Sequence, residues 1–493
     1  MLTSNHQIDI DTKHRELVAE ANACVAKARG RAEQDPLRPI YHLTTPAYYI
    51  SDPHGSIFYN GEYHVFFQQN PFAPESIDHG VKHRCWAHAA SKDLVHWEHW
   101  PIAIIPNPGS CDQNGTHTGS CVVHEGVPSI IYTGVSPEVQ CLARSNDGMR
   151  TWQKYPGNPV IGERPRDDLI GFRDPFVWKE QDTWYMVIGS GIRNKGGAVL
   201  LYDSKDLVHW EYMHPLCAGW FNEPGSPSTS EIRAGHSMAG RMWECPNFFP
   251  LGDKHMLIVS SFDDVKYSIG TYENHIFTPG PWHTIDMAAN REDFYAPNTM
   301  EDPTGRRIMW GWTSGGGTPG YPWNGVLTLP RMLSLRPDGR LGMEPLPELK
   351  DLRGKHNGWN DIAIAQRYAS LPTDIKGGSL EILTEIRPGD ADVFGIVVGT
   401  NTTHPLKIGY DQKGRSLFAG DRGGKFDLVD GEETLSFHIF VDMSVIEAFA
   451  NRRACITTRF YPEQKEVLGL SLFARGGAPE IRSVDLWEVH SIW

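Results

Sequence analysis

Three acidic residues each open a short apolar segment of the chain: Asp52 in YYISDPHG, Asp174 in GFRDPF and Glu244 in RMWECPNFFP. A carboxylate buried among apolar side chains costs free energy unless it is paired with another group or is kept for a chemical role. Like charges held close together cannot all ionise easily, so one member of such a group should keep a proton near neutral pH. Two carboxyls with divided roles are the machinery of glycosidic bond cleavage. The three acids therefore predict a carbohydrate-cleaving site.

The sequence around each acid suggests how the roles divide. Glu244 has apolar neighbours in Met242, Trp243, Phe248 and Phe249. Such neighbours should keep Glu244 protonated, so we expect it to be the proton donor. Asp52 has Ser51 and His54 as neighbours, so its surroundings should be more polar than those of Glu244. The structural alternatives are an ordinary Asp-Pro turn and a salt-bridged core glutamate.

A repeat explains how distant acids could meet. The octapeptide SKDLVHWE occurs at residues 91–98 and again at 204–211, and a looser copy occupies 145–153. Repeats of roughly 50 residues indicate four-stranded propeller blades. Five units of strand, polar turn and apolar strand are expected over residues 41–335. The acids begin the first strand of the first, third and fourth units, whereas Thr118 and Ala296 stand near that place in the second and fifth. The starting ends of the innermost strands should converge at one mouth.

The remaining chain completes an all-β fold class. Residues 1–40 form an N-terminal extension in which helical spacing of apolar residues predicts an amphipathic helix over 11–31, ending near Gly30. Residues 336–354 are a linker, and the short alternating segments of 355–493 predict a β-sandwich. The predicted architecture is a five-bladed β-propeller followed by a C-terminal β-sandwich, with a short N-terminal helix.

Composition excludes several function classes. A net charge of −14 and a pI near 5.9 argue against a nucleic-acid partner. No apolar run of about 18 residues predicts a membrane span, and the N-terminus lacks the apolar core of a signal peptide. Eight scattered cysteines favour a cytoplasmic protein with free thiols. A secreted form with its signal removed is the alternative. The oligomeric state is open, with a homodimer among the choices.

The motifs resemble those of glycoside hydrolase family 32, the β-fructofuranosidases and their fructosyltransferase relatives. The shared segments are RDP at 173–175, WECP at 243–246, DFYAP at 293–297, LPR at 329–331, SKDLVHW, and the late IFVDMSVIEAFA. The resemblance runs from Tyr41 to Trp493 and implies the same propeller and sandwich. It implies a fructoside substrate, small or oligomeric, with no metal and no organic cofactor. HRCWAH offers His83, Cys85 and His88, but this trio without a second cluster does not predict a metal site.

The resemblance also implies roles for individual residues. Asp52 would be the nucleophile, Glu244 the acid/base, and Asp174 the group that binds the fructosyl hydroxyls and steadies the transition state. The residues expected to contact substrate are Ser51, Gln68, Trp86, His117, Thr118, Arg173, Tyr295 and Trp312.

The sequence departs from the family pattern W-x-N-D-P-N-G around the nucleophile. Tyr49 replaces the tryptophan, Ser51 the first asparagine and His54 the second, and HTGS at 117–120 replaces F-S-G-S. Tyrosine and serine at the first two positions resemble members that transfer fructosyl groups to sugars. The expected reaction is retaining hydrolysis of terminal β-fructofuranosyl linkages in sucrose or fructans. The alternatives are fructosyl transfer giving oligofructosides or difructose anhydride, a non-catalytic carbohydrate-binding propeller, and an inverting arabinan hydrolase.

Overall fold

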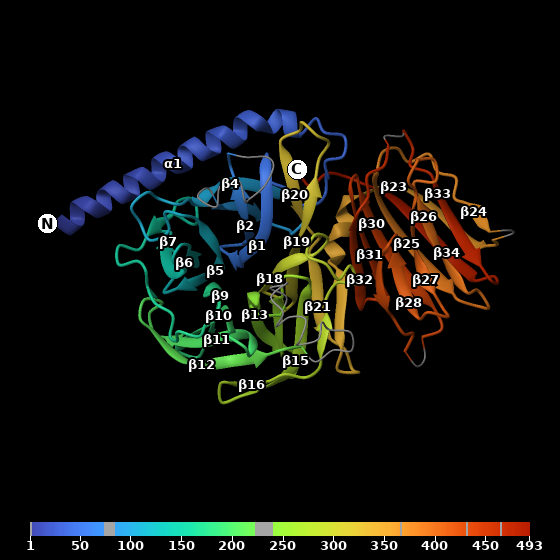
Figure 1. Ribbon diagram of the computed structural model, residues 1–493. Helices are drawn as coiled ribbons and strands as arrows, with labels where there is room; N and C mark the ends of the chain where they lie inside the picture. The colour runs from blue at the N-terminus through green and yellow to red at the C-terminus, as the bar shows by residue number, and fades with distance from the viewer. Residues whose placement is uncertain (1, 73–83, 222–239, 365–366, 430–431, 464–465) are drawn as a thin grey trace.

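The computed structural model describes residues 2–72, 84–221, 240–364, 367–429, 432–463 and 466–493. Its structure is mostly β, with one long helix at the N-terminal end (Figure 1). Figure 1 shows two bodies side by side: a larger one built from the blue-to-yellow part of the chain, and a smaller one built from the orange-to-red part. No described helix is both long and apolar enough to cross a membrane.

The larger body is built from antiparallel sheets that follow one another along the chain. Its first sheet begins with β1 (Tyr48–Tyr59), β2 (Glu62–Asn70), β3 (Cys85–Ser91) and β4 (Trp97–Ile104). The second holds β5 (Thr116–His124), β6 (Val127–Gly134), β7 (Val139–Arg144) and β8 (Gln153–Lys154). The third holds β9 (Arg173–Glu180), β10 (Thr183–Ile192), β11 (Gly196–Ser204) and β12 (Trp210–Gly219).

Two further groups of strands complete this body. The fourth sheet holds β13 (Glu244–Leu251), β14 (Lys254–Ser260), β15 (Val265–Glu273), β16 (Ile276–Thr278) and β17 (Trp282–Thr284). The last group holds β18 (Tyr295–Glu301), β19 (Arg307–Gly316), β20 (Trp323–Leu327), β21 (Arg331–Leu335) and β22 (Leu341–Pro345). β20 pairs in parallel with the start of β1, which joins the last group to the first sheet.

The first strands of the five groups form a closed ring. β1 contacts β5, β5 contacts β9, β9 contacts β13, β13 contacts β18, and β18 contacts β1 again. Each of these strands pairs with the next strand in sequence, as the predicted units require.

Both faces of the ring's sheets are apolar. On β13, Phe248 packs toward the third sheet, whereas its neighbour Phe249 packs toward the first and last groups. Successive side chains of a strand point to opposite faces, so each sheet packs between two neighbours. This is why the strands read as continuous apolar runs in the sequence.

The SKDLVHWE repeat forms a turn between the third and fourth strands of a sheet. In the first copy, the Asp93 carboxylate accepts the backbone N–H groups of Val95 and His96, at 3.0 and 2.8 Å. In the second copy, Asp206 accepts the corresponding N–H groups at 2.9 and 2.8 Å. The repeat is therefore a structural connector at the edge of its sheet.

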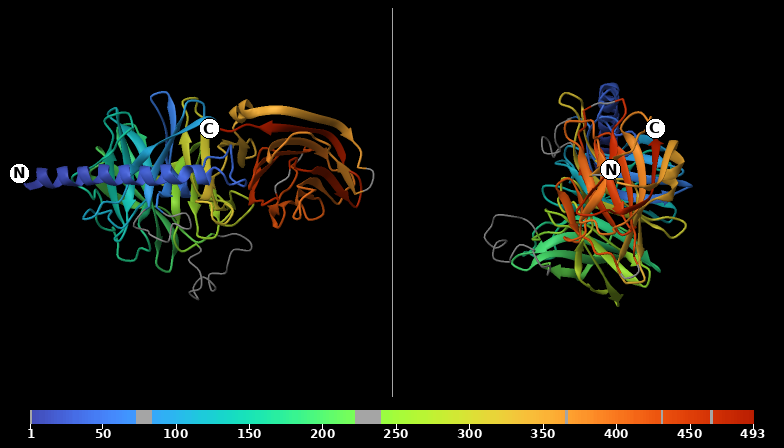
Figure 2. Two further views of the ribbon diagram at one scale, coloured as in Figure 1. Left: turned by 90° about the horizontal axis from the view of Figure 1, so that it is seen from above. Right: turned by 90° about the vertical axis from the view of Figure 1, so that its right-hand side faces the viewer.

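Helix α1 spans Leu2–Ala32 and is longer than the helix predicted over 11–31, because nothing in residues 2–10 interrupts it. It also runs through Gly30. The predicted apolar face is confirmed. Ala21 packs against residues from β3 and β4, and Val25 packs against Ala47 and Trp323. Figure 2 shows the helix lying across the larger body when it is seen from above.

The smaller body consists of two six-stranded sheets around one core. The first sheet holds β23 (Arg353–Ile362), β34 (Glu480–Val489), β25 (Ser379–Arg387), β30 (Leu435–Asp442), β31 (Val445–Ala450) and β32 (Ala454–Arg459). The second holds β24 (Tyr368–Ser370), β33 (Leu470–Arg475), β26 (Val393–Val398), β27 (Leu406–Asp411), β28 (Ser416–Ala419) and β29 (Arg422–Lys425). Both sheets contribute to one hydrophobic cluster. A short 3-10 helix, Pro347–Leu352, precedes this body.

A buried ionic network joins the two bodies. Arg331 donates two hydrogen bonds to Oε2 of Glu447, at 2.7 and 3.0 Å, and a third at 2.9 Å to Asp286. His42 lies between Asp442 and Glu447, at 2.9 and 3.1 Å. The LPR and IFVDMSVIEAFA segments of the sequence therefore meet at this junction, because they supply Arg331, Asp442 and Glu447.

Candidate active site

All five ring strands carry a β-bulge near their first residues. On β1, Ser51 and Asp52 together face Gln68 of β2, because Ile50 pairs with Gln69 and Pro53 with Phe67. The same two-against-one arrangement falls at 117–118 on β5, 174–175 on β9, 245–246 on β13 and 296–297 on β18. Bulges bend a strand and redirect its side chains, so this shared irregularity shapes one end of the ring.

The bulges show that the three acids do not occupy equivalent positions. Asp52 is the second bulge residue of β1, Asp174 is the first bulge residue of β9, and Glu244 immediately precedes the bulge of β13. The three acids lie at the same end of the ring strands, as expected. They do not occupy equivalent residue positions in those strands. Thr118 matches Asp52, whereas Ala296 matches Asp174.

Glu244 is held by two hydrogen-bond donors. Arg173 approaches Oε1 with Nη2 at 2.6 Å and Nε at 3.2 Å, and the Tyr295 hydroxyl donates to Oε2 at 2.7 Å. The expectation of an apolar surrounding is wrong, because Trp243 and Phe248 turn away into the core between the third and fourth sheets. The side chain of Glu244 is 17% exposed.

Asp174 is more deeply buried than Glu244. Thr118 donates its hydroxyl hydrogen to Oδ1, and the backbone N–H of Cys245 donates to Oδ2 at 3.1 Å. Burial, reinforced by the charge of Glu244, raises the pKa of Asp174 to about 6, although Arg173 opposes the shift. Asp174 also has a φ of +66°, a left-handed conformation that aspartate tolerates better than most residues. The bulge thus holds its carboxyl in a strained, well-defined place.

Asp52 is half-buried and lies near an arginine that the sequence argument overlooked. Burial raises the pKa of Asp52, the charge of Glu244 raises it further, and Arg84 lowers it. Desolvation therefore disfavours the charged form of Asp52, and Arg84 offsets part of this cost. Arg84 also lies 3.1 Å from Nε2 of His117, which brings β5 to the same side of the site.

The other predicted residues lie on the ring strands or on the strands paired with them, except Trp86, which lies on β3. Gln68 is fully buried, and both polar atoms of its amide lack a partner among the described residues. Such an amide is costly unless something binds it, so Gln68 is well suited to contact substrate. Trp86 is buried and donates to the carbonyl of His117 at 2.8 Å. Ser51 is buried beside Asp52.

Trp312 lies at the edge of the group. It pairs with Tyr295 across β18 and β19, and its ring centroid is 6.1 Å from that of Tyr49. Its indole nitrogen is buried and has no hydrogen-bond partner in the described part of the chain. His54, expected as a polar neighbour of Asp52, instead packs its ring on Trp86 with centroids 3.9 Å apart. Burial lowers the pKa of His54, so the imidazole is neutral.

Sequence reasoning missed three contributors. Arg84 lies in the HRCWAH segment but was given no role there, Glu138 lies outside the quoted motifs, and Cys245 acts through its backbone N–H. Glu138 accepts from Nη1 of Arg173 at 2.7 Å and so fixes the guanidinium that reaches Glu244. The only sequence signal for them is charge at the ends of apolar runs. The described residues contain no group of His, Cys, Asp and Glu suited to a metal ion, and His83 lies outside them.

Carboxyls gathered at one end of a ring of strands are the kind of arrangement that carboxylate glycosidases use. The chain belongs to glycoside hydrolase family 32. Its residues 42–345 match the model of the family's N-terminal domain, and residues 348–488 match that of its C-terminal domain. It is a β-fructofuranosidase-like hydrolase.

Individual relatives agree with this assignment. The chain is 32% identical to a sucrose-6-phosphate hydrolase of Escherichia coli, over 92% of this chain and 94% of that one. It is 30% identical to a levanase of Bacillus subtilis, over 92% of this chain and 71% of the levanase. Among solved structures, a Bombyx mori β-fructofuranosidase superposes with a TM-score of 0.79 at 26% identity, over 97% and 99%. Fructan 1-exohydrolase IIa from Cichorium intybus superposes with a TM-score of 0.79 at 25% identity, over 92% of this chain and 98% of that one.

Proposed function

We propose that this protein hydrolyses terminal β-fructofuranosyl linkages of sucrose or fructans with retention of configuration. We further propose that residues 41–335 form a five-bladed propeller, with the closed ring of β1, β5, β9, β13 and β18 as the innermost strands. Residues 336–354 would be the linker and 355–493 a β-sandwich. The observation that carries the function is the meeting of Asp52, Asp174 and Glu244 at one end of this ring, where Glu244 raises the pKa of both aspartates.

In this proposal Asp52 attacks the anomeric carbon while Glu244 protonates the departing glycosidic oxygen. The covalent fructosyl-enzyme is then hydrolysed by water that Glu244 activates as a base, and the two inversions give retention. Asp174, fixed by Thr118 and Cys245, binds the fructosyl hydroxyls. The buried amide of Gln68, which has no partner among the described residues, adds a further contact. A Bombyx mori β-fructofuranosidase mutant, which is 27% identical, was solved in complex with sucrose, and this supports the substrate class.

The site can hold the required proton near neutral pH. Three carboxyls share the site with two guanidinium groups, those of Arg84 and Arg173. Burial raises the pKa of Asp52, and it raises that of Asp174 to about 6. In such a coupled group the proton belongs to the cluster rather than to one residue. The cluster of carboxyls can therefore hold a proton near pH 6.

The test is to incubate the protein with sucrose, inulin and levan and to follow fructose release and its first-formed anomer by NMR. Asp52→Ala and Asp52→Asn should lower kcat by about 10⁴-fold or more without changing the thermal unfolding profile. Asp253→Asn, a change of an exposed turn residue, is the matched control. An inverted first product, or Asp52 variants that retain a tenth of the activity, would refute the mechanism.

Fructosyl transfer is the second candidate, and Ser51 favours it. Ser51 is buried next to Asp52 in a bulge where the family pattern has asparagine. A shorter side chain there leaves more space beside the fructosyl group and gives up one amide contact. An acceptor sugar can then compete with water for the covalent intermediate.

A further inference from the structure

Arg84 and His117 form a hydrogen-bonded pair at the end of the ring that carries the three acids. Nη1 of Arg84 lies 3.1 Å from Nε2 of His117. Arg84 immediately precedes β3, whereas His117 is the first of the two bulge residues on β5, the position that Ser51 holds on β1. The pair therefore joins the first two sheets at the level where their bulges shape the site.

The position of His117 also fixes a contact to one of the acids. A bulge leaves a residue outside the regular ladder, so other contacts have to hold the 117–118 bulge in place. The indole of Trp86 donates to the carbonyl of His117 at 2.8 Å, and Arg84 binds its ring. The next residue, Thr118, donates its hydroxyl hydrogen to Oδ1 of Asp174. The bonds that hold His117 therefore also place the donor to Asp174.

The hydrogen bond to Arg84 decides which nitrogen of His117 carries the proton. A guanidinium offers only donors, so Nε2 of His117 must accept through its lone pair. Burial, together with the positive charges of Arg84 and Arg173, holds the pKa of His117 well below its ordinary value, and the imidazole is neutral. A neutral imidazole that accepts at Nε2 carries its hydrogen at Nδ1. Arg84 therefore sets the tautomer of His117.

The Nδ1–H group of His117 is left open to a ligand. It has no hydrogen-bond partner among the described residues, and His117 is only half-buried. A donor placed in this way at a carbohydrate site matches a sugar hydroxyl. The family pattern F-S-G-S has a phenylalanine at this position, which offers only an apolar contact. This chain thus presents a directed N–H donor where the pattern has an apolar ring.

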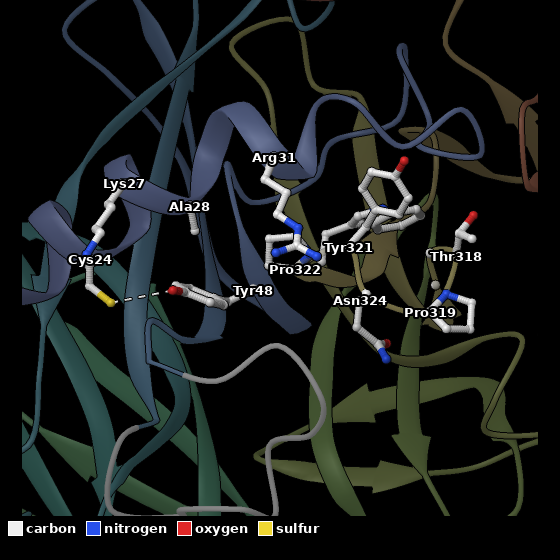
Figure 3. A pocket seen from close by; sticks show the side chains of 14 residues that line it. Cys24, Lys27, Ala28, Arg31, Tyr48, Thr318, Pro319, Tyr321, Pro322 and Asn324 are labelled. Carbon is white, nitrogen blue, oxygen red and sulfur yellow. Dashed lines mark hydrogen bonds between the residues drawn. The ribbon is translucent and has the colours of Figure 1, made fainter.

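The strand that carries Asp52 is anchored by helix α1. Figure 3 shows Tyr48, the first residue of β1, below the helix, with its hydroxyl 3.6 Å from the sulfur of Cys24. The backbone N–H of Tyr48 donates to the carbonyl of Pro322 at 2.6 Å. The start of β1 is therefore held without Arg84. A change at Arg84 should act on Asp52 through charge.

That charge is one of the few near Asp52. Burial raises the pKa of Asp52 most, Glu244 from β13 raises it further, and Arg84 lowers it. The thiol of Cys245 also faces Asp52, but burial raises its pKa well above the ordinary value, so it adds no charge. Without Arg84, a higher pH would be needed to ionise Asp52. The same guanidinium thus orients His117 and favours the ionised nucleophile.

We propose that Arg84 is a positioning residue of the active site, which holds His117 so that its Nδ1–H group donates to a hydroxyl of the bound fructoside. This inference rests on the proposed function and adds to it a residue that acts through another. Arg84 has two routes of action, the tautomer of His117 and the charge beside Asp52. Substitutions that keep the charge separate the two routes.

The first experiment compares Arg84→Met with Arg84→Lys. The methionine variant loses both the donor and the charge, so kcat/KM on sucrose should fall about tenfold, and the acid limb of its pH profile should move to higher pH. The lysine variant keeps the charge and should keep the acid limb of wild type. Arg340→Met, a change of an exposed arginine in the turn between β21 and β22, is the matched control and should behave like wild type.

The second experiment asks whether Arg84 acts through His117. His117→Phe removes the donor and leaves the charge of Arg84 in place. On the pH plateau above the acid limb, Arg84→Met should lower kcat/KM in the wild-type background but not in the His117→Phe background, because the contact is already lost. Equal losses in the two backgrounds, or an Arg84→Met variant within twofold of wild type, would overturn the proposal.

NMR of the imidazole nitrogens in histidine-labelled protein gives a readout that does not need catalysis. His117, identified by the signals missing from His117→Phe, should be protonated at Nδ1 in wild type and should lose this preference in Arg84→Met. A wild-type His117 protonated at Nε2 would overturn the proposal. If the tautomer changes as expected but no fructoside is cleaved, the proposed function fails while the assignment of Arg84 to His117 stands.

Discussion

The Tyr295 hydroxyl donates a hydrogen bond of 2.7 Å to Oε2 of Glu244. The bond links β18 to β13, two neighbouring strands of the ring. The other oxygen of Glu244 is held by Arg173 from β9, on the opposite side. The same tyrosine oxygen accepts the backbone N–H of Phe262 at 2.9 Å, which fixes the hydroxyl so that its hydrogen points to Glu244.

Removing this donor should impair catalysis without harming the fold. Tyr295→Phe keeps the buried ring but leaves Glu244 with one donor fewer, a loss of about 1–2 kcal/mol for a hydrogen bond to a charged group. We expect kcat/KM on sucrose to fall roughly tenfold or more. Tyr202→Phe is the matched control, since the Tyr202 hydroxyl is buried and accepts or donates no hydrogen bond within the residues that the structure describes. A Tyr295→Phe protein within twofold of wild type would contradict the role given to this bond.

The raised pKa of Asp174 predicts a stability cost that depends on pH. The group has a pKa of about 6 in the folded protein and 3.8 as its ordinary value. As pH rises through this interval the unfolded chain ionises first, so folding stability falls. The folding stability is greatest below about pH 4 and is lower above about pH 6. The difference is up to about 3 kcal/mol, at 1.36 kcal/mol per pKa unit.

Asp174→Asn should therefore be an inactive but stabilised protein. Asparagine cannot ionise, so the free energy of unfolding of the variant relative to wild type should increase between pH 4 and pH 7. Urea unfolding at both pH values measures this difference. The control Asp253→Asn changes an exposed residue and should show no such trend. If the Asp174 difference is independent of pH, the assigned cost of ionisation is wrong.

The junction between the two bodies should be sensitive to a single lost charge. Glu447 and Arg331 are both fully buried. Glu447→Gln leaves the guanidinium of Arg331 short of a charged partner, and breaking a buried pair typically costs about 3–5 kcal/mol. Glu344→Gln is the comparison, because its partner Arg452 is 76% exposed and such pairs contribute less than about 1 kcal/mol. Thermal unfolding of both variants provides the measurement; equal shifts would show that the network is not what couples the bodies.

Ser51→Asn should move the reaction toward hydrolysis. A longer amide beside Asp52 fills space and adds a hydrogen-bonding contact to the fructosyl group, which leaves an acceptor sugar less room to compete with water. Product analysis on concentrated sucrose should show oligofructoside or difructose anhydride for wild type and a smaller share for the variant. Only free monosaccharides from wild type, with no change in Ser51→Asn, would rule out the transfer activity.

The sequence by itself determined the strand units, their connectors and the apolar face of the N-terminal helix. These depend on local periodicity, which every packed strand or helix must obey. The consecutive apolar residues Phe248 and Phe249 indicate that both faces of their strand are buried. The two copies of SKDLVHWE indicate two identical turns. For the same reason the sequence placed Asp52, Asp174 and Glu244 at the same strand end, because each opens an apolar run.

Only the tertiary structure decided which partner each acid has. The bulges put Asp52, Asp174 and Glu244 at three different positions relative to the ladder. A bulge adds one residue and reverses which face the following side chains occupy. The residue types alone do not predict where such a bulge occurs. Glu244 therefore meets Arg173 and Tyr295 rather than its own apolar neighbours. Desolvation of the aspartates likewise depends on what packs around them from distant segments, and a linear sequence does not encode that burial locally.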